Sequence, residues 1–369
     1  MSEFSEGRAR QLLSLLEGRG VDAVLLFPGA DISYYTGFSI GPSERPAAAL
    51  IPVEGTPVFV VNELEGELRG MRPWFTDRVI WAEDGDPYAA IADAIKSRGL
   101  SPSIIGLAAD APWGWAQRVS ALLPGVKFVD ASAEVGKVRM VKTPEEIGWI
   151  REACAVADEA LGTCLARLRT GMTETELSAL LAAEMRRLGG EQSFQGVLFG
   201  ERAALPHGQP GSAALVPGDA VLVDMGCTRH GYWSDLTRTA FYGEPSPEHR
   251  AIYRTVERAN EAAYRAVHPG VACGYVDEAG RAIICDAGYG AHFIHRLGHG
   301  IGIQIHEEPY IVSGNQLKLE AGMVFSDEPG IYIVGDVGVR VEDTVACTDG
   351  GCERLTRFKQ DLAVYPVKC

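Results

Sequence analysis

The sequence predicts two consecutive domains, an α/β domain over residues 1–137 and an α+β domain over residues 138–369. The first observation behind this prediction is size, because 369 residues with 46% apolar content suit a globular protein of about two domains. The second is a change of pattern near residue 138, where short apolar runs give way to a long amphipathic segment. Each part of the chain is long enough to bury a core of its own.

Short apolar runs alternate with helical stretches from residue 1 to about residue 135. The runs are DAVLLF, AAALIPV, PVFVV, RVIWA, SIIGLA and VKFVD, and the helical stretches lie near 6–19, 87–98 and 113–122. Such an alternation is typical of helices packed around a mixed sheet. The first domain is therefore expected to be α/β.

The second domain begins with a helix start signal at TPEE, residues 143–146. Thr143 is the expected N-cap, and Pro144 with two glutamates fills the first turn of a long amphipathic helix. Further helices are expected at 173–189, which begins at TETE, and near 246–268 and 274–287. Strands and a strand-rich C-terminal third complete the chain.

Composition excludes several classes of function. The formal net charge of −15 argues against a nucleic-acid-binding surface. The apolar runs are far shorter than the ~20 residues of a membrane helix, and MSEFSEGRARQ lacks the apolar core of a signal peptide. The eight cysteines form no CxxC pair, which indicates reduced thiols. We expect a cytoplasmic protein without nucleic-acid or membrane partners.

The stretch LVDMGCTRHGYWSDLTRT, residues 222–239, places Asp224 and Asp235 on either side of a candidate hairpin turn. If the chain reverses between Arg229 and His230, the two carboxylates are direct cross-strand partners on one face of a sheet. Facing carboxylates repel, so they need protons or cations, and a metal ion is the simplest partner. The alternative is two solvated aspartates beside a hairpin, and a bulge at Gly231 would shift the register.

A second candidate hairpin, residues 324–344, repeats this arrangement with Glu328 and Glu342 on either side of a turn near Gly335. Strand alternation places Arg340 on the same polar face as Glu342. Between the two hairpins lies HRLGHGIGIQIHEEPY, in which Gly298, Gly300 and Gly302 prevent a helix and permit close approach of the backbone to a site. This segment supplies His299 and His306.

These stretches resemble the superfamily of creatinase, prolidase, aminopeptidase P and methionine aminopeptidase, which is built on the pita-bread fold. The motifs occur in the family's order: DMG with SDLTRT, GHGIG followed by HEEP, EPGIY, and RVED. YYTGF at 34–38 and VRMVKTPEEI at 138–147 are similar to the N-terminal domain and junction of the prolidase and aminopeptidase P branch. The resemblance implies an α/β N-terminal creatinase-like domain followed by an α+β pita-bread metallopeptidase domain.

The same resemblance implies roles for individual residues. The residues that match the family's metal ligands are Asp224, Asp235, His299, Glu328 and Glu342. His207, in ALPHGQP, and His306 match two catalytic histidines, and Glu328 also matches the residue that exchanges the proton. Arg340 matches a family arginine, so it either orients a ligand or substrate or is only a salt-bridge partner. His292 and His295 are interpreted as hydrogen-bonded structural residues.

The chemistry of this residue set can be judged apart from the resemblance. Four carboxylates and one imidazole carry about four negative charges, which two divalent cations neutralise and one does not. Mostly oxygen donors with a single nitrogen favour Mn²⁺, Co²⁺ or Zn²⁺. Two divalent metal ions are therefore expected, with an activated water as the nucleophile.

The function that the resemblance implies is hydrolysis of the bond between an N-terminal residue and proline in small peptides. A compact chain favours an Xaa-Pro dipeptidase over an Xaa-Pro aminopeptidase acting on longer peptides, whose chains are generally longer. A dipeptidase must bind the free carboxylate of proline, yet no arginine lies between Arg296 and Arg340, where prolidases often have one. Arg45, Lys318 or Arg340 would have to supply this contact.

Three further expectations remain open at the level of sequence. In this superfamily the N-terminal domain of one subunit often approaches the active site of another, so a homodimer is expected and makes Arg45 a reasonable candidate. The same fold could instead act on substrates without proline. A catalytically silent pita-bread module used for binding is the alternative from another class.

Overall fold

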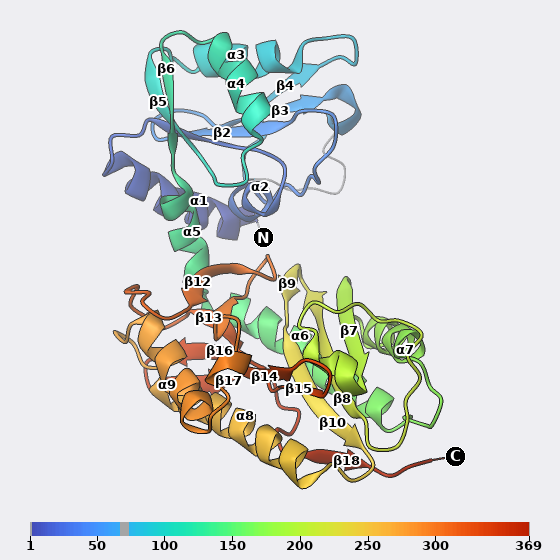
Figure 1. Cartoon of the computed structure of the whole chain (residues 1–369). Coiled ribbons are helices and arrows are strands. Elements are labelled where there is room, and N and C mark those ends of the chain that lie inside the picture. Colours follow the sequence, from blue (N-terminus) through green and yellow to red (C-terminus); the bar gives the residue numbers. More distant parts are fainter. Residues whose placement is uncertain (1, 67–73, 369) are drawn as a thin grey trace. The chain divides into compact units, whose positions relative to one another are not determined.

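The computed structural model describes residues 2–66 and 74–368. The chain divides into two compact units, Met1–Arg139 and Met140–Cys369, so the division falls two residues after the one predicted from the sequence (Figure 1). Each unit has its own buried core.

The first unit is built on a six-stranded sheet with the order β4-β3-β2-β1-β5-β6. β1 pairs antiparallel with β2, and β2 with β3, whereas the other three pairs are parallel. The sheet is therefore mixed, and its strands coincide with the six predicted apolar runs. The strands are β1 (Ala23–Leu26), β2 (Ala48–Pro52), β3 (Val58–Asn62), β4 (Arg78–Trp81), β5 (Ser103–Leu107) and β6 (Val126–Asp130).

Helices cover both faces of this sheet, with α1 and α2 on one side and α3 and α4 on the other (Figure 1). The helices are α1 (Ser2–Glu17), α2 (Ala30–Thr36), α3 (Pro87–Ser97), α4 (Trp113–Ala121) and α5 (Ser132–Met140), with a 3-10 turn at Glu63–Glu65. α1, α3 and α4 confirm the predicted helices. α2 and α5 were not predicted, and α2 is too short to show a repeated apolar period.

The second unit contains two five-stranded sheets and one two-stranded hairpin. The first sheet has the order β18-β10-β8-β7 with β9 added to β8, the second has the order β12-β11-β13-β16-β17, and β14 pairs with β15. The strands are β7 (Ser193–Phe199), β8 (Ala220–Arg229), β9 (Tyr232–Trp233), β10 (Leu236–Tyr242), β11 (Gly298–Gly300), β12 (Glu307–Ile311), β13 (Val324–Asp327), β14 (Gly330–Ile333), β15 (Val337–Arg340), β16 (Asp343–Thr348), β17 (Gly351–Arg354) and β18 (Ala363–Tyr365).

Four long helices pack against these sheets at the predicted places. They are α6 (Pro144–Leu165), α7 (Glu174–Arg187), α8 (Pro247–Ala266) and α9 (Cys273–Asp286), with 3-10 turns at Gly200–Ala204 and Gly290–His292. Thr143 and Thr173 each close a capping box with the glutamate three residues later, which confirms both predicted helix starts. α6 and α7 share a core with β8 and β10, whereas α8 and α9 share one with β13 and β15.

The first predicted hairpin has a different register from the one expected. Its turn is His230–Gly231, both with positive φ (53° and 79°), so Asp224 pairs with Thr237 and not with Asp235. A tight two-residue turn favours positive φ at both central positions, and this preference fixes the register. The shift is two residues, so Asp235 stays on the same face as Asp224.

The second predicted hairpin is confirmed. β14 and β15 pair from Gly330 opposite Arg340 to Ile333 opposite Val337, and the turn contains Gly335. Glu328 and Glu342 lie just beyond its open end. The amide of Glu328 donates to Leu297 O (2.9 Å), and the amide of Glu342 donates to Thr237 O (3.0 Å). The second hydrogen bond joins this segment to β10 in the first sheet.

The glycines of GHGIG permit close packing between strands. A Cβ atom at Gly298 would lie 1.9 Å from Ser326 O, and one at Gly300 would lie 2.2 Å from Glu308 O. Real Cβ atoms do not approach backbone oxygens so closely. The close approach is therefore between β11 and its neighbouring strands.

The seven described cysteines are all free, and Cys369 lies outside the described residues. Among the helices of the described residues, none is long and apolar enough to cross a membrane.

Arg238, in the SDLTRT motif, joins the first sheet to the start of β16. Its Nη2 lies 2.7 Å from Asp343 Oδ1, and both side chains are buried. Its nitrogens also donate to the carbonyl oxygens of Glu342 (2.5 Å) and Phe358 (2.7 Å). Thr356 donates a further hydrogen bond to Asp343 (2.8 Å). This buried network fixes the backbone that carries Glu342.

We predict that Arg238→Met lowers the free energy of unfolding by about 3–5 kcal/mol, because it removes the cation from a buried ion pair. Urea unfolding followed by circular dichroism measures the change. Arg254→Met removes the same charge from the surface pair Arg254–Glu257, whose arginine side chain is 52% exposed, and should cost less than about 1 kcal/mol. Equal effects of the two changes would contradict the structural role given to Arg238.

Candidate metal centre

The five residues predicted as metal ligands come together in the second unit from separate segments. Their ligand atoms form overlapping sets in which all atoms lie within 4.8 Å of one another. The three sets are Asp224, Asp235 and Glu342; His299, Glu328 and Glu342; and Asp235, His299 and His306. Because the sets share members, they describe one continuous site. β8, β11 and the segments just before β10, β14 and β16 contribute the five side chains.

All eight site residues predicted from the sequence line one cavity of about 520 Å³. Cavities of this size hold small ligands. The lining residues are Phe194, Pro206, His207, Asp224, Trp233, Asp235, His295, Arg296, His299, Ile305, His306, Glu328, Arg340 and Glu342. The polar groups are therefore gathered at one place within a partly apolar wall.

Burial raises the affinity for protons of three carboxylates of the site, those of Asp235, Glu328 and Glu342. Asp235 and Glu342 are 3% and 2% exposed. Burial is the largest cause that raises the pKa of both well above the ordinary value, followed by the negative charges of the neighbouring acids. Burial also raises the pKa of Glu328 to about 7. Such a cluster is stabilised by positive charge within it.

His299 offers an unprotonated nitrogen to these acids. Burial, and then the charge of His306, lower its pKa to about 3, so the ring is neutral. Nδ1 lies 3.2 Å from Gly300 O, and a carbonyl only accepts, so Nδ1 carries the hydrogen. Nε2 therefore presents a lone pair to Glu328 Oε1 (3.3 Å) and Asp235 Oδ2 (3.6 Å). A cation between them would satisfy all three groups, so the donor set fits a metal ion.

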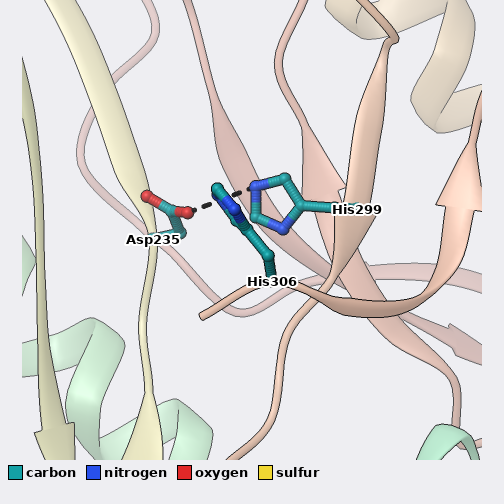
Figure 2. Close-up of side chains that lie close together, drawn as sticks. All are labelled: Asp235, His299 and His306. Atoms are coloured by element: carbon teal, nitrogen blue, oxygen red, sulfur yellow. Dashed lines mark ion pairs between the residues drawn. The ribbon is translucent and has the colours of Figure 1, made fainter. Parts of the chain in front are cut away.

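His306 lies against His299, with ring centroids 4.0 Å apart and planes at 64°. Figure 2 shows the two rings beside Asp235, with the Asp235–His299 contact dashed. His306 is exposed, unlike His299 and Asp235. The geometry permits a ligand role as well as the predicted role toward substrate. His207 is also exposed and lines the same cavity, in the segment between β7 and β8.

Arg340 holds two of the acids in place. Its Nη2 donates to Asp224 Oδ2 (2.5 Å) and its Nε to Thr237 Oγ1 (3.0 Å). The Thr237 hydroxyl in turn donates a short hydrogen bond to Glu342. Arg340 is buried, so this cation is a fixed part of the site. The contact with Asp224 fits both roles weighed for Arg340, a salt-bridge partner and a group that orients a candidate ligand.

Tyr332 is a part of this network that the sequence did not predict. Its hydroxyl accepts from Arg340 Nη1 (3.0 Å) and lies 2.9 Å from His295 Nε2. His295 Nδ1 lies 2.7 Å from Arg296 O, so Nδ1 donates and Nε2 accepts from Tyr332. Burial lowers the pKa of His295 to about 4, which keeps it neutral. His295 is thus hydrogen-bonded as predicted, and it links Tyr332 to the cavity wall.

The predicted candidates for binding a substrate carboxylate lie in different places. Arg340 lines the cavity but is held by the acids, Arg45 is paired with Glu83 in the first unit (2.9 Å), and Lys318 is exposed. Lys318, in the second unit, does not line the cavity. Arg296, which was not proposed from the sequence, does line it.

Two family models match the chain. The model of metallopeptidase family M24 matches residues 148–349, and the model of the creatinase/prolidase N-terminal domain matches residues 8–141. Together they cover most of both structural units.

Individual relatives match almost the whole chain. An Xaa-Pro dipeptidase from Lactobacillus helveticus is 37% identical over 91% of this chain and 93% of its own. The crystal structure of the dipeptidase PepE from Mycobacterium ulcerans superposes with a TM-score of 0.92 at 34% identity, covering 99% of both chains. An X-Pro aminopeptidase from Thermotoga maritima gives a TM-score of 0.86 at 31% identity, covering 97% of this chain and 99% of its own.

The buried acids predict how stability of the metal-free protein depends on pH. Glu328 has a folded-state pKa of about 7 against an ordinary value of 4.5. Between these values the folded state binds the proton and the unfolded state does not, so stability falls as pH rises. The difference of about 2.5 pKa units corresponds to about 3 kcal/mol. Glu328→Gln should therefore gain stability relative to the wild type by up to about 3 kcal/mol between pH 5 and pH 8.

Urea unfolding of both proteins after exhaustive chelation measures this difference. Comparison with the Gln variant cancels the titrating groups away from the site, whereas Asp235 and Glu342 respond to the charge of Glu328 and contribute to the measured difference. A difference that stays constant across this pH range would contradict the raised pKa of Glu328.

Proposed function

The chain belongs to metallopeptidase family M24 and carries a creatinase/prolidase N-terminal domain, and on this premise we propose that it is a two-metal Xaa-Pro dipeptidase. The expected fold class, an α/β creatinase-like domain followed by an α+β pita-bread metallopeptidase domain, is confirmed by these matches and by the solved relatives. The observation that carries the proposal is the unprotonated Nε2 of His299 among buried acids in one cavity.

The negative charge of the candidate ligands supports two bound metal ions. The four carboxylates at Asp224, Asp235, Glu328 and Glu342 share one fixed cation, Arg340. With a neutral His299, the ionised set would carry about three negative charges, which one divalent ion leaves unbalanced. The five predicted ligands would hold the ions, and Mn²⁺, Co²⁺ and Zn²⁺ suit their oxygen-rich set. Bound there, the ions would supply an activated water and polarise the peptide carbonyl.

The remaining groups of the site have positions that suit catalysis. The Glu328 carboxylate accepts a hydrogen bond from Ser326 Oγ (3.0 Å), which fixes its orientation while leaving it in contact with the cavity. It would take a proton from the attacking water and pass it to the leaving nitrogen. His207 and His306 are exposed to the cavity and would donate hydrogen bonds to the oxygen of the reacting carbonyl.

The relatives support proline in the second position of the substrate, because enzymes named Xaa-Pro dipeptidase and X-Pro aminopeptidase match 91% and 97% of this chain. The Thermotoga enzyme matches at nearly full length, so chain length does not separate a dipeptidase from an aminopeptidase. Arg296 lines the cavity and has no ion-pair partner among the described residues. A cation there favours the dipeptidase, since a dipeptide brings a carboxylate close to the reacting carbonyl. The Xaa-Pro aminopeptidase remains the second candidate. The homodimer stays a prediction.

Metal content tests the ligand assignment independently of activity. We predict about two bound ions per chain in the wild type, and loss of metal in Asp235→Asn and Glu342→Gln, because each change removes a charged donor from a buried set. Elemental analysis after dialysis measures the stoichiometry. Retention of both ions in either variant would mean that the ligands are assigned wrongly.

His306→Ala and His207→Ala are the matched controls. If these histidines act only on the substrate, each variant keeps its metal while kcat falls by about 10²-fold. Loss of metal in His306→Ala would make His306 a ligand, and unchanged turnover would leave both residues without a catalytic role.

Substrate choice tests the activity itself. We predict that the metal-loaded protein cleaves Ala-Pro with a kcat/KM at least about 100-fold above Ala-Ala, and faster than Ala-Pro-Ala. Release of alanine, measured by chromatography, reports all three reactions. Equal cleavage of Ala-Pro and Ala-Pro-Ala would favour the aminopeptidase, and indifference to proline would exclude both. Absence of turnover with both ions bound would favour a silent binding module.

A further inference from the structure

A buried ion pair adjoins the segment that carries His306. Lys142 Nζ lies 2.7 Å from Glu307 Oε1, and the two side chains are only 1% and 6% exposed. Lys142 belongs to VRMVKTPEEI and Glu307 to HEEP, so two residues 165 positions apart in the sequence meet here. Neither side chain is among the described residues that line the cavity. An effect of this pair on the site is therefore indirect, through the chain that carries His306.

Residues 301–306 form an irregular loop between β11 and β12, and His306 is the last residue of this loop. The Glu307 carboxylate lies against the backbone of the loop. Its Oε2 accepts a hydrogen bond from the amide of Gln304 (3.4 Å), and a Cβ atom at Gly302 would lie 2.4 Å from its Oε1. The carboxylate is therefore packed against the loop at two positions before His306.

The backbone of Lys142 is fixed beside β13 in the second sheet. Its amide donates to Gly322 O (2.9 Å), and Val141 forms a bridge with Met323, the residue before β13. From this position the ammonium holds the Glu307 carboxylate by a charge-assisted hydrogen bond. The loop 301–306 is thus tied through Glu307 and Lys142 to the chain next to β13.

The position of the His306 ring depends on this backbone. The ring contacts the ring of His299, with centroids 4.0 Å apart, but in the part of the chain that the structure describes no hydrogen bond holds it. A group that donates to a reacting oxygen has to be held within about 0.5 Å of its productive position. The loop, and the ion pair that braces it, must supply this precision.

We propose that Lys142 is a positioning residue, which acts through Glu307 to hold the loop 301–306 so that His306 faces the reacting carbonyl. This inference rests on the proposed peptidase function and deepens it, because it assigns the placement of His306 to two buried residues outside the cavity. Without Lys142 the Glu307 carboxylate would be buried and unpaired, which is strongly unfavourable. The carboxylate would turn toward solvent, and the loop would move with it.

Steady-state kinetics of the metal-loaded protein on Ala-Pro test the proposal in a double-mutant cycle. Lys142→Met should lower kcat by about tenfold and change KM by less than about threefold, with the metal content of the wild type retained. In a His306→Ala background the same change should lower kcat by less than about twofold, because the group that Lys142 positions is already absent. A change that acts on turnover independently of His306 would lower kcat equally in both backgrounds.

Two further variants separate positioning from the cost of a buried charge. Lys142→Met/Glu307→Gln leaves no unpaired charge, so it should fold, and its kcat should stay about tenfold below that of the wild type. Arg139→Met is the matched control, because it removes the cation of the buried pair Arg139–Asp31 in the first unit. It should leave kcat within about twofold of the wild type.

Hydrogen exchange followed by mass spectrometry tests the loop without substrate. The amides of residues 301–307 should exchange at least about tenfold faster in Lys142→Met than in the wild type, while those of α8 stay unchanged. This measurement uses the metal-loaded protein and is independent of turnover.

The proposal is overturned if exchange of the loop is unchanged in Lys142→Met, or if this variant keeps wild-type kcat or loses its metal. Equal losses of kcat in the two backgrounds, or wild-type kcat in Lys142→Met/Glu307→Gln, also overturn it. Unchanged turnover of His306→Ala does so as well, since His306 then has no catalytic role that requires positioning. Failure of the wild type to cleave any peptide overturns the proposed function instead, and the exchange measurement still tests whether Lys142 holds the loop.

Discussion

Repulsion between buried carboxylates is the constraint on which the second unit depends. Asp235 lies far in the sequence from Glu328 and Glu342, which flank the β14–β15 hairpin, and folding places the three acids together. Arg340 holds Asp224 and Thr237 holds Glu342 against this repulsion by hydrogen bonds, and Arg340 also donates to Thr237. Both sheets and the β14–β15 hairpin must therefore be assembled before the site exists, and the ligand positions depend on the fold as a whole.

In the SDLTRT motif, both faces of one strand help to hold the acids of the site in place. Asp235 and Thr237 face the acids, and Thr239 accepts a hydrogen bond from the amide of Arg340 (3.1 Å). Arg238 alternates with them and faces the other side, where it binds Asp343. One face of β10 therefore orients candidate ligands, while the other fixes the segment that carries Glu342.

Much of the fold and the candidate site can be predicted from the sequence because the signals are local. Thr143 caps its helix in a box of four residues, and Gly335 marks a hairpin. The prediction that Asp224 pairs with Asp235 was wrong, because the register is set by the turn conformation at His230–Gly231 and not by charge.

Contacts between distant segments give no such local signal. Thr237 could have been expected on the face of Asp235, two residues away on a strand. The position of Arg296 could not, because it lies in irregular chain before β11, where alternation does not indicate the direction of a side chain. Tyr332 could not be predicted either, since its role depends on His295 and Arg340 together.

The backbone hydrogen bonds at the acids have a consequence for metal affinity. The amide of Asp235 donates to Thr344 Oγ1 (3.1 Å), as those of Glu328 and Glu342 donate to Leu297 and Thr237. These bonds involve only protein groups, so the ligand backbone is ordered on folding and little conformational entropy is left to lose when ions bind. The acids repel one another, and cations bound between them would relieve this repulsion and stabilise the folded protein. The fold itself would therefore favour tight retention of metal.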